Sequence, residues 1–70
     1  MNYTFTYDKG VFTITEDGDV VFQKDLYYEY EREQVRQMME AILQHTEIPQ
    51  DEIAPLMDDI RYRGYVSIDV

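Results

Sequence analysis

The 70-residue sequence contains no cysteine, and it contains only one serine, Ser67, and one histidine, His45. Without cysteine the chain has no disulfide, no thiolate nucleophile and no cysteine-ligated zinc, so its fold depends on packing, and the composition suits a reducing cytoplasm. A catalytic serine–histidine pair requires these two residues to meet, yet the pattern places Ser67 on the outward side of a strand and His45 at the end of a helix. We therefore expect no enzymatic activity and no cofactor.

Long apolar runs are also absent, because no uninterrupted apolar stretch exceeds three residues. A membrane-spanning helix needs about 20 apolar residues, and a secretion signal needs a basic segment followed by about 7 to 15 apolar residues. Residues 1–7 contain no basic residue. We expect a cytoplasmic protein that is complete as written, with neither a leader nor a membrane anchor.

Basic residues are scarce: 6 Lys or Arg stand against 15 Asp or Glu, and the net charge is -9. Such a surface repels phosphate and anionic lipid, so direct binding to DNA, RNA or a membrane is disfavoured. The acidic excess is spread along the chain, at -2 over residues 1–24, -3 over residues 25–45 and -4 over residues 46–70. With 44% hydrophobic and 14% aromatic residues, the chain is expected to fold as one acidic domain over residues 1–70.

Strand patterns dominate the first third of the sequence. Residues 2–7 alternate between aromatic and polar side chains, residues 11–15 form a second β-branched and aromatic run, and a third run opens at Val20. Turn residues separate these runs at positions 8–10 and 16–19, and the second turn contains an Asp-Gly hairpin signal. The sequence predicts a three-stranded antiparallel meander.

The pattern beyond the third run allows two continuations. Alternating apolar residues carry the strand past Lys24 toward Tyr28, whereas Asp25 is a suitable cap to end the strand and start a helix. From about Glu29 to about His45 the period is helical. One apolar stripe of this first helix consists of Val35, Met38, Met39 and Ile42.

A shorter second helix follows Pro49. It repeats the helical spacing at Ile53, Leu56, Met57 and Ile60. Because proline lacks an amide donor, Pro55 cannot sit deep in a helix, so we expect a looser turn and then a regular helix from near Ala54. Gly64 supplies a C-cap, and residues 65–70 alternate as a final strand. The predicted fold is α+β, a small two-layer sandwich of order βββααβ in which two helices cover one face of an antiparallel sheet.

The segment around the start of the first helix is unusually rich in tyrosine and acid. Tyr27, Tyr28 and Tyr30 cannot all point inward from a helix or a strand, so at least one is expected to be exposed. An exposed tyrosine beside carboxylates is typical of an interface with a basic partner, although surplus tyrosines can also cover a sheet edge. The residues predicted to bind a partner are Tyr27, Glu29, Tyr30, Glu31, Glu33 and Glu40 on the first helix, and Asp51, Glu52, Asp58 and Asp59 on the second.

Other charged clusters have simpler explanations. The run from Glu16 to Asp19 is too short for a calcium loop and is explained by a hairpin turn. The acidic pairs at 51–52 and 58–59 are two helical turns apart, which is typical of a solvated helix face, and no histidine or lysine joins them. We expect no metal site. Arg61 and Arg63 are expected to pair with Asp58 or Asp59.

A folded body with this much negative charge presents to a basic cleft an array similar to the phosphates of a nucleic acid. The sequence therefore predicts a non-enzymatic inhibitor that occupies the basic, nucleic-acid-binding surface of a partner protein. In size, acidity and lack of catalytic groups it resembles the small anti-defence proteins of bacteriophages, the anti-CRISPR and anti-restriction inhibitors. This resemblance is one of overall character and assigns no residue. For a phage-encoded protein it implies the cytoplasm of the host cell.

Two alternatives stay open. The first is a structural or accessory subunit that pairs with itself or with another protein through its sheet edge and tyrosine cluster, with acidity serving only solubility. A homodimer is compatible with both this alternative and the inhibitor. The second alternative, an enzyme that uses paired carboxylates, is the least favoured.

Overall fold

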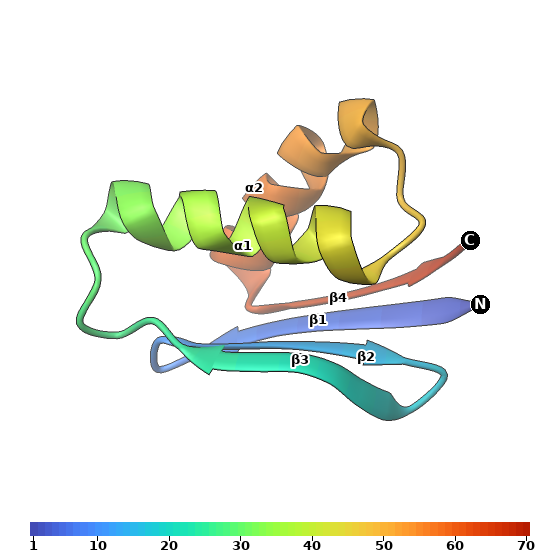
Figure 1. The fold of residues 1–70 in the computed structure, drawn as a ribbon, viewed down its shortest axis with the longest axis horizontal. Helices are drawn as coiled ribbons and strands as arrows, with labels where there is room; N and C mark the ends of the chain where they lie inside the picture. Colours follow the sequence, from blue (N-terminus) through green and yellow to red (C-terminus); the bar gives the residue numbers. More distant parts are fainter.

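The computed structural model describes all 70 residues and has the predicted element order. The elements are β1 (Asn2–Asp8), β2 (Val11–Glu16), β3 (Asp19–Asp25), α1 (Glu31–His45), the 3-10 turn η1 (Gln50–Glu52), α2 (Ile53–Arg63) and β4 (Tyr65–Asp69). The strands form one antiparallel sheet of order β3-β2-β1-β4, and both helices lie on the same side of it (Figure 1). The α+β prediction is confirmed.

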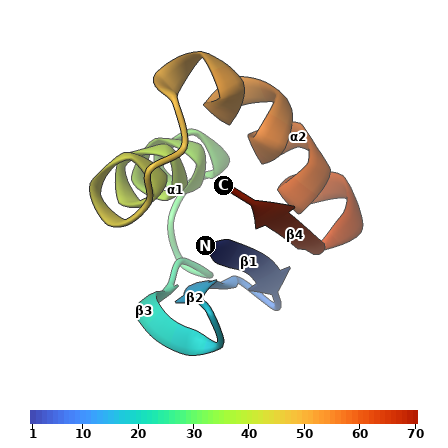
Figure 2. The ribbon, with the colours of Figure 1, turned by 90° about the vertical axis from the view of Figure 1, so that its right-hand side faces the viewer.

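The two helices divide one face of the sheet between them. A view along the strands shows α1 over the β2–β3 side and α2 over the β1–β4 side (Figure 2). Thirteen hydrophobic side chains are buried between the layers. They include Tyr3 and Phe5 of β1, two residues of the predicted α1 stripe, Met38 and Ile42, and all four predicted apolar residues of α2. The periodicities in the sequence therefore identify the buried faces correctly.

Both tight hairpins have two central residues with positive φ, as the twist of antiparallel strands requires. Lys9 and Gly10 have φ values of 51° and 84°, and Asp17 and Gly18 have values of 50° and 89°. Gly10 has a second constraint, because a Cβ at this position would lie 2.6 Å from the Tyr27 Cβ, whereas a Cβ at Gly18 would meet nothing within 4 Å. The first hairpin turn is therefore packed against the loop that precedes α1.

The end of β3 follows neither of the two predicted continuations completely. The strand ends at Asp25, but the Asp25 carboxylate accepts a hydrogen bond from the backbone N–H of Tyr27 at 2.9 Å and does not cap a helix. Leu26 is buried, and its N–H donates to the Gly10 carbonyl at 2.7 Å. Helix α1 begins at Glu31, later than the predicted Glu29.

This later start corrects the placement of three candidate residues. Tyr27, Glu29 and Tyr30 were predicted on the first helix but lie in the loop before it, with Tyr30 at the N-cap position. The physical reason is that burial of Leu26 and the Asp25 turn hold the backbone in a non-helical path up to the cap.

The second helix begins and ends as predicted. The 3-10 turn η1 precedes α2, and Pro55 is the third residue of that helix, where no intrahelical donor is lost. Gly64 ends α2 at a φ of 76°. The longer helix, α1, has 15 residues, and no helix of the structure combines the length and apolar character needed to span a bilayer.

Candidate functional site

The path of the chain separates charge between two ends of the molecule. The four strands and α1 run between the same two ends, and α2 crosses this direction at an angle, so distant segments gather at each end (Figure 1, Figure 2). The smaller part, which we call the tyrosine half, consists of 23 residues, 7–11, 24–36 and 61–65. It contains six of the seven tyrosines and all six Lys or Arg, together with five Asp or Glu. The remainder, the acidic half, contains ten Asp or Glu and no Lys or Arg.

The acidic excess is thus even along the sequence but concentrated in space. The formal charge is +1 for the tyrosine half and -10 for the acidic half. Several acids of the acidic half are held by neutral donors. The Tyr3 hydroxyl donates to Glu16 at 3.2 Å, and Asp17 accepts the backbone N–H of Asn2 at 2.8 Å. The Tyr3 hydroxyl is a neutral donor at neutral pH and leaves the Glu16 charge in place, and burial raises the pKa of Tyr3 further above its ordinary value of 10.0.

The most open part of the acidic half is a row of four carboxylates along η1 and α2, which we call the α2 ridge. It consists of Asp51, Glu52, Asp58 and Asp59, all of them exposed and none in an ion pair. Asp58 and Asp59 lie opposite the buried side of α2, and Asp51 and Glu52 are exposed on the 3-10 turn that leads into it. These four candidate residues are therefore exposed on one continuous helical segment.

The candidate acids of α1 have a different environment. Arg36 bridges Glu33 and Glu40, with a distance of 2.9 Å from the Arg36 guanidinium to the Glu40 carboxylate. Glu31 pairs with Arg61 of α2. The expectation that Arg61 pairs with Asp58 or Asp59 is wrong, because the Arg61 side chain of α2 and the Glu31 side chain of α1 reach each other in a hollow that Tyr7 and Gln34 also line. Three of the predicted binding carboxylates are thus partly neutralised.

The Arg36 bridge provides a measurable signature. The hydrogen bond from Arg36 lowers the pKa of the Glu33 carboxyl below its ordinary value of 4.5. Any stability from this bond is therefore present above pH 4.5 and is lost as the pH falls through the lower folded-state pKa.

We expect Arg36→Met to raise the Glu33 pKa, measured by the pH dependence of its carboxyl carbon chemical shift. Glu40→Gln is the control, because it leaves the Glu33–Arg36 bond intact. An unchanged Glu33 pKa in Arg36→Met would contradict the bridge.

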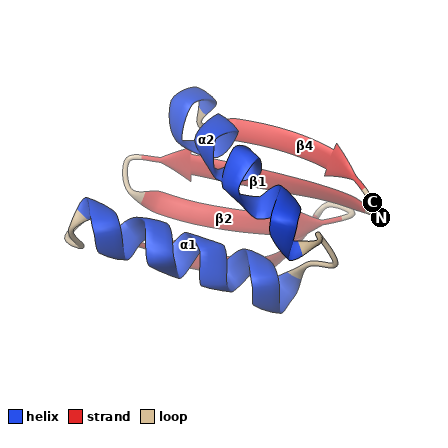
Figure 3. Cartoon of the chain, turned by 90° about the horizontal axis from the view of Figure 1, so that it is seen from above, coloured by secondary structure: helices blue, strands red, loops and turns tan.

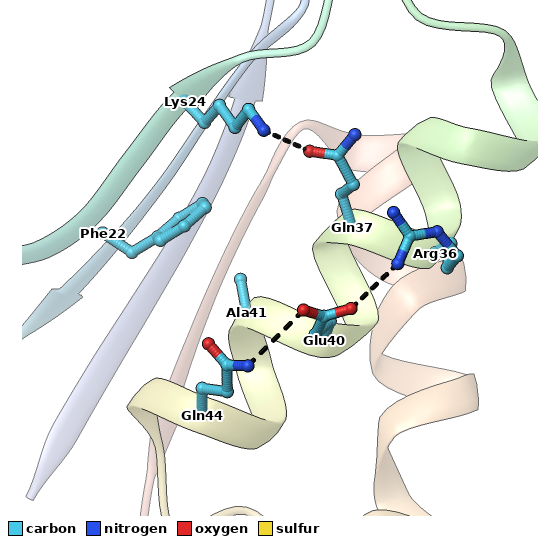
Figure 4. Close-up of a pocket in the computed structure, with 7 residues that line it drawn as sticks. All are labelled: Phe22, Lys24, Arg36, Gln37, Glu40, Ala41 and Gln44. Atoms are coloured by element: carbon cyan, nitrogen blue, oxygen red, sulfur yellow. Dashed lines mark hydrogen bonds and ion pairs between the residues drawn. The ribbon is translucent and has the colours of Figure 1, made fainter.

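A shallow groove of about 240 Å³ lies between β3 and α1 (Figure 4). Its polar side chains bind one another: Lys24 donates to Gln37 at 2.6 Å, and Glu40 accepts hydrogen bonds from Arg36 and Gln44. Glu40 is the one carboxylate that lines the groove, and Glu33 lies beside it, bound to the lining residues Arg36 and Gln37. No group of three or more His, Asp or Glu residues is arranged to hold a metal ion.

The single histidine and the single serine do not meet. The His45 ring ends α1 and packs against Phe22 with ring centroids 5.2 Å apart. Ser67 lies on β4, at the opposite edge of the sheet from β3, where its hydroxyl accepts a hydrogen bond from the Asn2 side-chain amide at 3.1 Å. This separation prevents a serine–histidine pair within one chain.

Tyrosine exposure exceeds the prediction. Tyr27, Tyr28 and Tyr30 are 63%, 92% and 88% exposed, and the first two rings contact each other edge to face at 5.1 Å. Tyr62 is 89% exposed on α2 and is not among the residues predicted to bind a partner. Its position, four residues after Asp58 and three after Asp59, was the available signal, because residues at this spacing share a helix face.

Comparisons with protein-family models, with curated proteins and with solved structures find no match for this chain. The site is therefore interpreted from its own geometry and charge.

Proposed function

We propose that this protein is a non-enzymatic inhibitor that uses its acidic half to occupy the basic, nucleic-acid-binding surface of a partner protein. The observation that carries the proposal is the charge separation, with ten Asp or Glu and no Lys or Arg among the 47 residues of the acidic half. A surface of one sign attracts and orients a basic cleft and speeds encounter, and its field extends about 8 Å at physiological salt.

The α2 ridge is the proposed centre of this interface. Its four carboxylates have no ion-pair partner to exchange, so a lysine or arginine of the bound protein replaces only water. Glu33 and Glu40, by contrast, must leave Arg36 before they engage a partner. Tyr62 adjoins the ridge and supplies an exposed aromatic ring, the residue type that anchors many interfaces. The first-helix candidates are thus assigned a secondary role.

The finer proposal is an inhibitor of the phage anti-defence type, an anti-CRISPR or anti-restriction mimic of DNA. Its support is the small size of the chain and the carboxylate array on a folded surface. The partner is then a nucleic-acid-handling protein of the host cytoplasm, and the inhibitor competes with DNA or RNA for the same cleft.

Salt-dependent capture tests the proposal. The tagged protein is immobilised, exposed to host lysate and washed at about 0.05 M and about 0.5 M salt, which changes the screening length from about 14 to about 4 Å. We expect basic nucleic-acid-binding proteins to be retained at low salt. At high salt the retained amount should fall at least tenfold. The purified partner should also lose DNA or RNA binding when the protein is added in equal amount. Retention that is independent of salt would contradict the proposal that the acidic half is a decoy, that is, a substitute for nucleic acid in the partner's cleft. A partner that still binds nucleic acid would contradict it equally.

One observation favours a second candidate function, an accessory subunit that docks through the loop before α1. Three tyrosines of this loop are 63% to 92% exposed, so their rings contribute little to the core and are free to contact another protein. Docking through these rings would change little with salt, and Tyr28→Ser with Tyr30→Ser would abolish it. The decoy should retain its partner in this double variant, because both rings lie before α1 and not on the α2 ridge.

A further inference from the structure

The two edges of the sheet differ in how they are protected. Edge strand β3 has a bulge between its pairings with Ile14 and Thr15, and it contains Asp19, Lys24 and Asp25. Bulges and charges of this kind discourage pairing with another strand. Edge strand β4 pairs regularly with β1 over five consecutive residues, contains no lysine, proline or bulge, and has a single charged residue, Asp69, at its last position. Seen from above, the outer side of β4 is open along most of its length (Figure 3).

The hydrogen-bond pattern shows which backbone groups of β4 are free. Tyr7 donates its N–H to the Gly64 carbonyl at 3.0 Å, and Val70 donates its N–H to the Met1 carbonyl at 2.8 Å. In an antiparallel pair, residues alternate between those that face the neighbour and those that face away. Even-numbered residues of β4 therefore face β1. The N–H and C=O groups of Tyr65, Ser67 and Asp69 point to the open edge, which leaves six backbone groups available.

We propose that β4 pairs antiparallel with β4 of a second copy of the chain, about a two-fold axis at Ser67. In this register Ser67 faces Ser67 of the second copy, and Tyr65 faces Asp69 of the second copy. Each of the six free groups on each strand then has a partner, whereas any shifted register leaves some unpaired. The product is a continuous eight-stranded sheet built from two four-stranded ones.

Side chains on both faces are compatible with this pairing. On the helix side, Val66 would face Ile68 of the second copy. Both residues are half-buried against the core, so pairing extends the apolar layer. The two-fold axis also sets the tyrosine half of one copy beside the acidic half of the other. The last turn of α2 lies over the start of β4, and its Arg63, which has no ion-pair partner within the chain, would approach Asp69 of the second copy.

A cysteine crosslink tests both the edge and the register. In a hydrogen-bonded antiparallel pair the Cα atoms are about 5.5 Å apart, within the range that a disulfide spans. The chain has no other cysteine. We expect Ser67→Cys to form a covalent dimer under mild oxidation, and a mixture of Tyr65→Cys with Asp69→Cys to form the mixed dimer. Gln23→Cys, exposed at the same kind of outward position on β3, is the matched control. Crosslinking of Gln23→Cys as fast as Ser67→Cys would overturn the proposal.

The unmodified protein provides an independent measurement. Its mass by analytical ultracentrifugation should rise toward twice that of the chain with concentration. Ser67→Pro removes one outward N–H per strand and keeps the β1 ladder, so we expect it to raise the dimer dissociation constant roughly tenfold or more. Added salt should favour the dimer, because each copy carries a net charge of -9, whereas it weakens the proposed decoy contact. A wild-type chain that stays monomeric at high concentration in high salt would overturn the pairing and leave the decoy untouched.

Discussion

Replacing all four carboxylates of the α2 ridge by their amides is expected to weaken capture of the basic partner about a hundredfold. The quadruple variant is Asp51→Asn, Glu52→Gln, Asp58→Asn and Asp59→Asn. Each exposed ion pair with the partner contributes about 0.7 kcal/mol, so the loss of four amounts to about 3 kcal/mol, which is a factor of about one hundred in affinity. The measurement is the dissociation constant of the purified pair at low salt, with circular dichroism to verify the fold.

Matched double variants locate the interface within the protein. Asp58→Asn with Asp59→Asn removes two charges from the ridge, and we expect a loss of about tenfold. Glu33→Gln with Glu40→Gln removes the same charge from α1, where Arg36 already occupies both carboxylates, and should weaken binding less than threefold. Equal losses in the two variants would indicate a general field effect without a defined ridge. If neither variant changes binding, the acidic half has no part in recognition.

The largest effect on stability is expected at the turn between β1 and β2. Gly10→Ala should lower the free energy of unfolding by about 3 to 4 kcal/mol. A positive φ costs an L-residue about 1 to 2 kcal/mol, and forcing a methyl group into a packed site costs about 1 to 3 kcal/mol. The new Cβ would lie 2.6 Å from the Tyr27 Cβ and 2.7 Å from the Tyr27 Cα, and the backbone there is held by the Leu26 hydrogen bond to Gly10.

Gly18→Ala distinguishes the cost of a positive φ from the cost of forcing a methyl group against Tyr27. Gly18 has a similar φ of 89°, but a Cβ there meets nothing within 4 Å, so we expect a loss of only about 1 to 2 kcal/mol. Urea unfolding of both variants and of the wild type measures the difference. A domain of this size has a total stability of about 4 to 10 kcal/mol, so Gly10→Ala should be close to unfolded at elevated temperature. Equal losses at the two glycines would show that the loop before α1 is not packed against the turn.

Local patterns were sufficient to predict the elements because burial imposes its own period on each segment. The alternation over residues 2–7 and the spacing from Ile53 to Ile60 both reflect one buried face, and each can be read without knowledge of the partner layer. The start of α1 could not be predicted this way. It depends on the Gly10 carbonyl, which binds Leu26 sixteen positions later and keeps the Tyr27 backbone out of the helix.

The candidate site also combines features that local patterns predict with features that depend on long-range contacts. The spacing of the acids at 51–52 and 58–59 predicted a shared helix face; in the structure all four are exposed, the first pair on the turn η1 and the second on α2. The ion pair between Glu31 and Arg61 joins residues 30 positions apart, and no local pattern indicates it. Only with the fold known can the free carboxylates of α2 be distinguished from the neutralised ones of α1.

The sequence by itself determined that this chain is an acidic α+β protein of order βββααβ, because strand and helix periods, turn residues and net charge are properties of short segments and of composition. Only the tertiary structure decided where the charge lies. Acid that is even along the sequence is concentrated in an acidic half of 47 residues with ten Asp or Glu and no Lys or Arg, because the strands and α1 run between the same two ends and all the Lys and Arg residues gather toward one of them.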